Sequence, residues 1–220
     1  MVFADRVDAG RRLATRLADL RGTDTVVLGL PRGGVPVAAE VAIALDLPLD
    51  VIVVRKLGVP WQPELAMGAI GEGDVTIVSD EIGRSVRVSD RAFREVQRRE
   101  RDELRRRVLR FRGHDHRLDL TGRTALVIDD GVATGSTARA ACRVARAQGA
   151  TAVILAVPVA PLGWAPEPGE VDRFVCLEAP DRFGAVGRFY ADFSPTTDDE
   201  VNACLQRTAA SANQPPGDAG

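Results

Sequence analysis

Lysine is almost absent from this chain of 220 residues. Of its 29 basic residues, 28 are arginine and one is lysine, at position 56. Basic and acidic residues nearly cancel, to a net charge of -2, so the overall charge gives no case for binding to nucleic acid or to a membrane surface. Because arginine serves at every other basic position, we interpret Lys56 as a site that needs a compact ammonium group. Chance is the alternative, since one lysine must stand somewhere.

Long apolar runs, paired cysteines and clustered histidines are absent too. No apolar run approaches the roughly 20 residues that span a bilayer, and residues 1–6 do not form the apolar core of a secretory signal. We therefore expect a cytoplasmic protein without membrane contacts. The three cysteines lie far apart, which favours buried thiols over a disulfide framework. His114 and His116 stand in the polar stretch 113–117, which favours exposed loop histidines over a metal site.

Strand and helix patterns alternate along the chain. We predict helices at 5–20, about 34–45, 84–112, 136–148 and 197–207, and strands at 25–30, 49–54, 75–78, 125–130, 152–159 and 174–177. Residues 57–74 are expected to form a loop and a short strand. This alternation predicts an α/β fold, a mostly parallel sheet with helices on both faces. One domain is expected over 1–208, followed by a disordered tail at 209–220, which is small, polar and rich in proline.

Twelve arginines and five acidic residues lie between positions 84 and 112. The apolar residues in between follow roughly helical spacing: Val88, Phe93, Val96, Leu104, Val108 and Leu109. They predict one long helix, inserted into the domain, with a thin apolar stripe. We favour a solvated face with i,i+4 pairs such as Glu95–Arg99 over a nucleic-acid surface, because no aromatic interleaving accompanies the arginines. A protein–protein surface along the stripe stays open, as does the oligomeric state, for which a homodimer is one option.

The stretch 126–137 holds the most informative motif. A hydrophobic strand ends in Asp129 and Asp130, and a loop with one glycine and three hydroxyl residues then opens a helix: Thr134, Gly135, Ser136 and Thr137. Ligands of open α/β sheets bind at the carboxyl ends of strands, and a helix N-terminus offers unpaired N–H groups to a phosphate. Two adjacent carboxylates can accept from a vicinal diol or hold a hydrated Mg²⁺. The motif therefore predicts a ribose 5-phosphate site, whereas a purely structural turn would need neither feature.

Residues 128–137 resemble the motif of type I phosphoribosyltransferases that binds 5-phosphoribosyl-1-pyrophosphate (PRPP). The chain also resembles a bacterial group whose members are named phosphoribosyltransferases on the basis of their sequences. This likeness extends from the N-terminal helix to about Val201. It implies a Mg²⁺-dependent transferase of nucleotide metabolism that moves the phosphoribosyl group from PRPP to a nitrogen nucleophile, as in purine salvage, and releases pyrophosphate. It also implies that Asp129 and Asp130 engage the ribose hydroxyls and Mg²⁺, while Ala133 to Thr137 cradle the 5-phosphate.

Two further turns resemble parts of the same family. The sequence Leu-Pro-Arg-Gly-Gly follows the first core strand and looks like the family's pyrophosphate loop. There Gly33 and Gly34 would allow a positive φ or an unusual peptide geometry, and Arg32 would add a charge-assisted contact. Arg55 and Lys56 follow the second strand, where type I enzymes carry a mobile loop with basic residues that close over pyrophosphate. The resemblance thus implies that Arg32 and Lys56 stabilise the leaving group. An ordinary strand-to-helix turn is the alternative for the first motif.

Residues 178–196, a hood-like C-terminal segment, loosely resemble the base-binding stretch of 6-oxopurine phosphoribosyltransferases. By that resemblance Phe183 stacks on a base and Asp192 approaches the metal; aromatic packing on the sheet is an equal alternative. Ala133 stands where the 6-oxopurine enzymes carry an acid and is closer to the adenine type, so the acceptor base stays open. The rival to an enzyme is a regulatory protein of the same fold that senses PRPP or nucleotides or binds nucleic acid. The Lys56 loop favours the enzyme.

Overall fold

The computed structural model describes residues 2–78, 88–112 and 117–212. Its elements are α1 (Arg6–Arg16), the 3-10 helix η1 (Ala18–Leu20), β1 (Thr25–Gly29), α2 (Gly34–Leu45), β2 (Leu49–Val51), β3 (Val54–Val59), β4 (Gln62–Gly71), β5 (Thr76–Val78), α4 (Asp90–Arg112), β6 (Thr124–Ile128), α5 (Ser136–Ala147), β7 (Ala152–Val159), β8 (Arg173–Glu178), the 3-10 helix η2 (Val186–Phe189) and α6 (Asp198–Ala212). No helix in these ranges is long and apolar enough to cross a bilayer.

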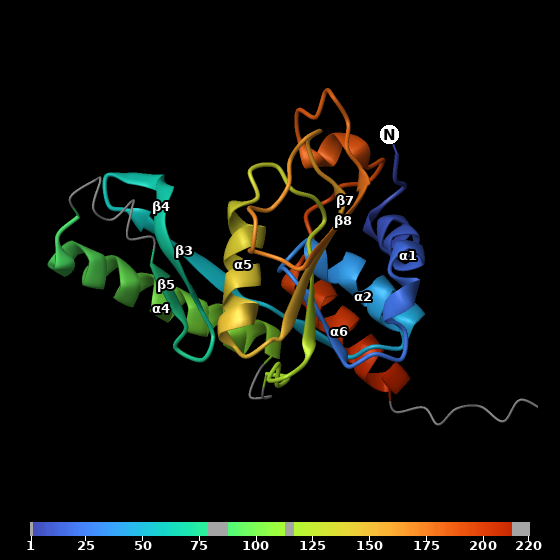
Figure 1. The fold of residues 1–220 in the computed structure, drawn as a ribbon, viewed down its shortest axis with the longest axis horizontal. Helices are drawn as coiled ribbons and strands as arrows, with labels where there is room; N and C mark the ends of the chain where they lie inside the picture. Colours follow the sequence, from blue (N-terminus) through green and yellow to red (C-terminus); the bar gives the residue numbers. More distant parts are fainter. Residues whose placement is uncertain (1, 79–87, 113–116, 213–220) are drawn as a thin grey trace, which may run out of the picture.

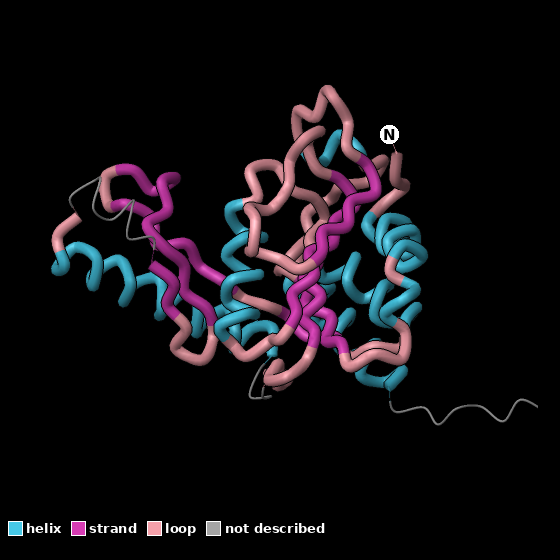
Figure 2. Tube along the Cα trace, viewed as in Figure 1, coloured by secondary structure: helices cyan, strands magenta, loops and turns pink. Residues whose placement is uncertain are grey.

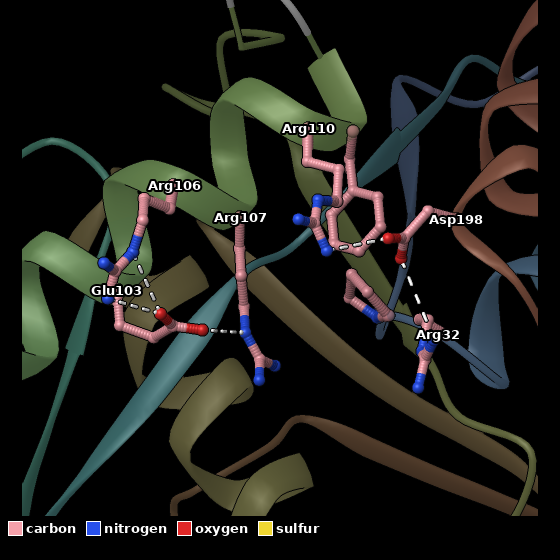
Figure 3. A pocket seen from close by; sticks show the side chains of 8 residues that line it. Arg32, Glu103, Arg106, Arg107, Arg110 and Asp198 are labelled. Atoms are coloured by element: carbon pink, nitrogen blue, oxygen red, sulfur yellow. Dashed lines mark hydrogen bonds and ion pairs between the residues drawn. The ribbon is translucent and has the colours of Figure 1, made fainter.

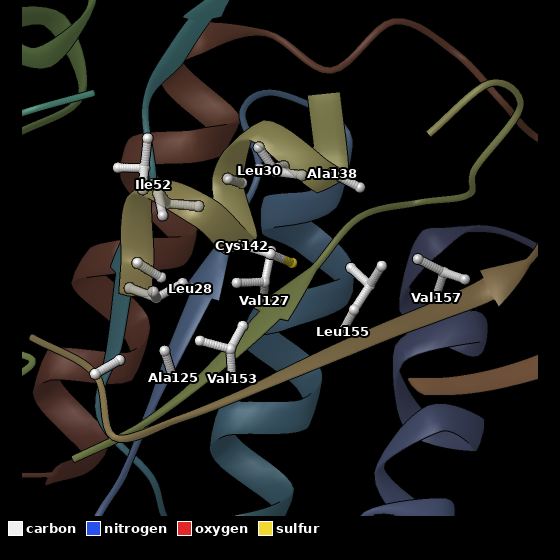
Figure 4. Close-up of a cluster of buried hydrophobic side chains, with 14 of the residues drawn as sticks. Leu28, Leu30, Ile52, Ala125, Val127, Ala138, Cys142, Val153, Leu155 and Val157 are labelled. Atoms are coloured by element: carbon white, nitrogen blue, oxygen red, sulfur yellow. The ribbon is translucent and has the colours of Figure 1, made fainter. Parts of the chain in front are cut away.

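Five parallel strands form the central sheet, in the order β2-β1-β6-β7-β8. Helix α5 covers one face, and α1 and α2 cover the other (Figure 1). Alternate residues of each strand serve the two layers: Val26 and Leu28 pack with α5, whereas Val27 packs with α1 and α2. Figure 4 shows the α5 side, where Cys142 lies among strand valines and leucines. The predicted α/β fold is confirmed, and continuous apolar strands are what a sheet covered on both faces requires.

A second sheet corrects the prediction for residues 57–74. Strands β3, β4 and β5 form an antiparallel sheet outside the central one (Figure 2). We expected one strand at 49–54 and mainly loop after it, because glycine and proline are frequent there. Instead β2 ends at Val51, and β3 and β4 form a hairpin turning at Pro60 and Trp61. A Cβ on Gly68 would lie 2.3 Å from the Ile77 carbonyl oxygen, so glycine here permits close strand pairing rather than a loop.

Helix α4 packs its apolar stripe on this hairpin. Val96, Leu104 and Phe111 are buried against residues such as Leu57 and Met67 of the second sheet. The stripe is therefore engaged within the chain, although its last member, Leu109, is 55% exposed. The helix begins at Asp90 rather than at residue 84; residues 84–87 lie outside the described part. We call β3, β4, β5 and α4 (described residues 54–78 and 88–112) the arm, which Figure 1 shows projecting beyond α5.

The expected solvated face of α4 is present, with different partners. Glu95 pairs with Arg91 at 3.1 Å, four residues before it, while Arg99 contacts Glu100. The predicted Glu95–Arg99 pair is therefore wrong. A pair four residues apart is geometrically available in both directions along a helix, so the spacing alone does not select the partner.

A buried ion cluster ties the C-terminal end of α4 to both sheets. Arg112 contacts Asp50 of β2 at 2.9 Å, the Val51 carbonyl at 2.8 Å, and Glu72 directly after β4. The Asp50 carboxylate also accepts the backbone N–H groups of Val51 and Leu118. Burial lowers the pKa of Arg112, but the charges of Asp50 and Glu72 more than offset this, and the net direction is upward. The cluster holds its charges by pairing them, as buried ions require.

The helix ends show which boundaries the sequence predicts well. Thr197 and Glu200 form a capping box at the start of α6, where the sequence predicts a helix from 197, with N–H to side-chain distances of 2.7 Å and 3.2 Å. Gly149 follows α5 with φ +99, as expected for a glycine that ends a helix. Helix α1 is shorter than predicted and gives way to η1 after Leu17. Helix α6 continues to Ala212, which corrects the expected disorder at 209–212.

Several predictions fall on residues without a described position. His114 and His116, and the tail from 213 onward, lie outside the described residues.

Cys142 is buried and the other two cysteines are half-buried, and all three are free thiols. Burial raises the pKa of Cys142 to about 12, in keeping with the small hydrophobic role predicted for it.

Candidate functional site

Two sequence motifs meet where β1 and β6 end. The strands are parallel neighbours, with Gly29 paired to Ile128, so the turns that follow them lie at the same edge of the sheet. The Leu30 N–H donates to the Ile128 carbonyl at 2.9 Å. A Cβ on Gly34 would lie 2.6 Å from that carbonyl oxygen, and one on Gly33 would lie 2.0 Å from an Asp130 carboxylate oxygen. The turn after β1, residues 30–34, which we call the β1 turn, is thus in direct contact with the two aspartates.

The two glycines are needed for this contact, which refines the sequence interpretation. Gly33 has φ -63, and Gly34 is the first residue of α2, so of the two alternatives expected here, a positive φ or an unusual peptide geometry, the first is absent at Gly33. The unusual peptide geometry is present one step earlier, since the Pro31–Arg32 bond is cis. What the glycines provide is space, because any larger residue would push the turn away from the aspartates.

Asp130 is held by two residues from distant parts of the chain. Arg6 of α1 contacts the Asp130 carboxylate through Nε and Nη2, both at 2.9 Å. The Tyr190 hydroxyl donates to the Asp130 carbonyl at 2.5 Å. Arg6 also donates to the Ser194 carbonyl at 2.8 Å and stacks over Phe193. The N-terminal helix and the C-terminal segment therefore fix the orientation of this carboxylate.

Asp129 has no cation of its own in the described structure. Its carboxylate accepts the backbone N–H of Asp130 at 2.9 Å. Burial and the neighbouring charge of Asp130 raise the pKa of Asp129 to about 8. Burial also raises the pKa of Asp130, although Arg6 opposes this shift. A buried carboxyl with a raised pKa is stabilised by a cation or by hydroxyl donors that favour its charged form.

Replacing this carboxyl should stabilise the ligand-free protein above pH 4. In the unfolded chain the Asp129 carboxyl ionises near its ordinary pKa of 3.8, whereas in the folded protein it keeps its proton up to about pH 8. The loss of folding stability caused by the buried Asp129 carboxyl is therefore absent below pH 4. It grows between pH 4 and 8 and is constant above that. We expect Asp129→Asn to raise the free energy of unfolding by about 1–3 kcal/mol at pH 7.5.

Urea unfolding at pH 4 and at pH 7.5 checks this expectation. Asp181→Asn removes an exposed carboxyl and serves as the control, which should behave as the wild type at both values. A stabilisation by Asp129→Asn that is equal at pH 4 and pH 7.5 would contradict the raised pKa.

The loop after Asp130 is packed from outside by a tryptophan. Gly135 has φ +78, a left-handed conformation, and precedes α5 directly. A Cβ on it would lie 2.1 Å from the Trp164 ring, whose Nε1 donates to the Thr134 carbonyl at 3.3 Å. Glycine is thus required at this position both by the left-handed φ and by the close packing of Trp164. Thr134, Ala133 and Thr137 are exposed.

Lys56 reaches the same loop from the arm. Its Nζ donates to the Ser136 hydroxyl at 3.2 Å, and Ser136 lies 3.4 Å from the Thr134 hydroxyl. Arg55 forms an ion pair with Glu100 of α4 at 2.6 Å. A pocket of about 240 Å³ lies between these elements, walled by Leu30, Pro31, Ile52, Val53, Val54, Arg55, Lys56, Arg107 and Thr137. Lys56 and the β1 turn therefore border one cavity next to the N-terminus of α5.

Three of the candidate side chains are not brought to the aspartate pair. The Arg32 guanidinium lies 3.9 Å from Asp198 of α6, on the side of the turn that faces α4 (Figure 3). Asp192 is exposed and accepts from Ser194 at 2.6 Å. Phe183 stacks on Phe189 with ring centroids 5.5 Å apart, within an aromatic cluster of the C-terminal segment. In the described ranges, no group of three or more His, Cys, Asp or Glu side chains could hold a metal ion.

Sequence reasoning missed Arg6, Tyr190, Trp164 and Arg107. Arg6 is one of many arginines and binds a residue far along the chain, so its spacing carries no signal. Tyr190 is the only tyrosine of the chain; its rarity was the one available hint. Arg107 was assigned to a solvated helix face, yet it borders the cavity beside Lys56. These contacts depend on tertiary packing, which periodicity does not report.

A family model described as a phosphoribosyl transferase domain matches residues 4–194, which include the β1 turn, Lys56 and the aspartate pair. The chain belongs to the type I phosphoribosyltransferase family. The chain is 56% identical over 207 residues to a Mycobacterium tuberculosis (strain H37Rv) protein whose provisional name is phosphoribosyl transferase Rv0571c. The match covers 94% of this chain and 47% of that protein, so the chain spans about half the length of its curated relative.

A solved structure shares the fold of this chain. The crystal structure of TT1426 from Thermus thermophilus superposes with a TM-score of 0.81 at 42% sequence identity. The alignment covers 94% of this chain and 99% of TT1426, so the central sheet with its helices and the arm belong to one shared architecture.

Mg²⁺, which the family implies, is compatible with the residues present. Mg²⁺ is commonly held by one or two carboxylates together with substrate phosphates and water, and Asp129 and Asp130 supply two carboxylates. Burial and the charge of Asp130 raise the pKa of Asp129, and a cation bound beside it would favour its charged form. Arg6 already pairs with Asp130, whereas Asp129 has no ion-pair partner in the described structure, so Mg²⁺ would compensate the charged form of Asp129.

Proposed function

We propose that this domain transfers the 5-phosphoribosyl group of PRPP to a nitrogen nucleophile of the nucleobase class, with release of pyrophosphate. One observation carries the proposal: the β1 turn, the aspartate pair and the Lys56–Ser136 contact gather around the ends of β1 and β6. This grouping offers backbone N–H groups, an ammonium and two carboxylates within one edge of the sheet, which suits a phosphorylated sugar.

In this reaction the bond between C1 of the ribose and the pyrophosphate oxygen breaks, and a bond from the acceptor nitrogen to C1 forms. The bonding electrons leave with pyrophosphate, and the acceptor nitrogen loses a proton to solvent. Lys56 would stabilise the charge that develops on the leaving group, together with N–H groups of the turn at Arg32. The exposed hydroxyl residues at the start of α5 would bind the 5-phosphate. Mg²⁺ bound here would supply further stabilisation of the pyrophosphate charge.

The aspartate pair would position the ribose. Its carboxylates can accept hydrogen bonds from the 2- and 3-hydroxyls, and Arg6 and Tyr190 hold Asp130 in one orientation. Positive charge that develops at C1 would then lie near a carboxylate whose geometry is already fixed. Preorganised charge of this kind lowers a barrier because little reorganisation is needed in the transition state.

Calorimetric titration of PRPP with Mg²⁺ tests the site, followed by release of pyrophosphate in the presence of individual nucleobases. We expect micromolar binding, on the order of -8 kcal/mol, and a loss of about tenfold to fiftyfold in Asp129→Asn/Asp130→Asn, because charge-assisted hydrogen bonds are removed. Asp181→Asn is the control. The proposal is contradicted if the wild-type protein is correctly folded and does not bind PRPP. Binding without turnover on any nucleobase would favour the sensing protein instead.

A further inference from the structure

A pocket lined by arginines lies between α4, α6 and the β1 turn (Figure 3). Its volume is about 490 Å³. We call it the arginine pocket, and its walls are Pro31, Arg32, Glu103, Arg106, Arg107, Arg110, Phe111 and Asp198. Three separate segments of the chain therefore build one concavity, which a solvated helix face alone would not do.

The charge of the arginine pocket has one sign. Four guanidinium groups stand against two carboxylates, which leaves an excess of two positive charges in a chain whose net charge is -2. Like charges gathered in a concavity raise each other's free energy, and they focus the field on an entering anion. The excess therefore matches a ligand with at least two negative charges.

The guanidinium groups are held in place by the two carboxylates. Glu103 contacts Arg106 at 2.8 Å and Arg107 at 3.0 Å. On the opposite wall, Asp198 contacts Arg110 at 2.9 Å and Arg32 at 3.9 Å. Sharing one carboxylate between two arginines orients both and neutralises only half of their charge. Each guanidinium carries five N–H donors, so donors remain for a ligand after these contacts.

The choice of arginine indicates the kind of anion. A planar guanidinium binds the oxygens of a phosphate in pairs, while an ammonium acts as a point charge. Glu103, Arg106, Arg107 and Arg110 recur at three- and four-residue steps, which places them on one face of α4. Their side chains are 32%, 72%, 44% and 66% exposed, so solvent and solutes reach them.

We propose that the arginine pocket binds a phosphate-bearing anion of two or more charges, at a site distinct from the one proposed for PRPP. The arginine pocket does not include the aspartate pair, Lys56 or the loop at Ser136. It adjoins that site, because Pro31 and Arg107 border both cavities. An anion held by Arg32 would contact the same turn whose other side touches Asp130, so the two sites share a structural element.

Calorimetric titration with inorganic tripolyphosphate, without added Mg²⁺, tests this second site. We expect Arg106→Gln/Arg110→Gln to weaken binding by about tenfold or more. The matched control is Arg98→Gln/Arg105→Gln, which removes the same charge from the same helix outside the arginine pocket and should stay within about twofold of wild type. Thermal unfolding of both variants verifies that they fold.

A variant that is expected to bind tripolyphosphate more tightly shows that the changes in affinity do not come from a loss of structure. Asp198→Asn removes one of the two carboxylates and should tighten tripolyphosphate binding about threefold. The proposal is overturned if Arg106→Gln/Arg110→Gln binds as wild type does, or if Lys56→Met abolishes binding while the arginine variant retains it, since the ligand would then occupy the site proposed for PRPP. Because the probe is not PRPP, failure of the proposed transferase function leaves these outcomes unchanged.

The source of the phosphate is distinguished by a second ligand. ATP carries the same three phosphoryl groups on a nucleoside, so it is compared with tripolyphosphate on the same variants. If ATP and tripolyphosphate bind with equal affinity, and both affinities fall equally in Arg106→Gln/Arg110→Gln, the site recognises phosphate alone. Tighter binding of ATP with the same dependence on Arg106 and Arg110 assigns it to a phosphorylated small molecule. If ATP binding does not depend on these arginines, the second assignment fails.

Discussion

Gly34→Ala is expected to abolish PRPP binding. The added methyl group would lie 2.6 Å from the Ile128 carbonyl oxygen and 2.9 Å from the Asp129 Cα. Both are backbone atoms, so the β1 turn and the aspartate strand must move apart. Displacement of about 1 Å in a positioned site costs on the order of a hundredfold, and we expect at least that loss of PRPP affinity. Overpacking should also lower the free energy of unfolding by about 1–3 kcal/mol.

A glycine in open space provides the control for this substitution. Gly122 has φ +76, and a Cβ added to it would meet nothing within 4 Å, so Gly122→Ala introduces backbone strain without a clash. It should lose some stability and keep full affinity for PRPP. If Gly34→Ala binds PRPP as tightly as Gly122→Ala does, the close contact between the two loops is not part of the site.

Arg112→Met should be the most destabilising single substitution in the arm. Arg112 is 9% exposed and is the partner shared by Asp50 and Glu72. Removing it leaves two carboxylates without their cation, which typically costs about 3–5 kcal/mol when the partners stay buried. We expect a loss of this size in urea unfolding, with PRPP binding retained where the variant is folded.

Arg105→Met is the matched control on the same helix. Its guanidinium is 68% exposed and lies 3.8 Å from Asp102, and pairs of this kind contribute about 0–1 kcal/mol. Equal destabilisation by the two substitutions would show that the buried cluster does not hold the arm.

The central fold follows from local patterns, and the arm does not. The strands at β1, β6 and β7 are continuous apolar runs, and the order of strands and helices restricts how they can join. In the arm, alternation along β4 is interrupted by glycines that the pairing itself requires, such as Gly68. A residue that marks a loop in one context permits close approach in another, so composition alone pointed the wrong way.

The candidate site likewise combines residues that a local motif predicts with residues that only tertiary packing places. Asp129, Asp130 and the hydroxyl loop form one contiguous motif, and their position at the end of a strand follows from the sequence. Arg6, which pairs with Asp130, lies 124 residues before it in the sequence and has no local pattern that distinguishes it. Arg32 shows the reverse case: its backbone lies in the predicted turn, but its side chain points to Asp198 and α6, which only the packing of three segments decides.

The pairing of β1 with β6 has a consequence for the order in which the chain can acquire its site. Thr25 pairs with Thr124, so nearly half the chain, including the whole arm, lies between the two central strands. Contacts between residues so far apart form slowly, because closing long loops costs entropy before any pairing compensates for it. During synthesis, the β1 turn leaves the ribosome well before the strand that completes it. Until β6 follows, one edge of β1 stays unpaired, while α1 and α2 are the first elements available to cover a face of the strand.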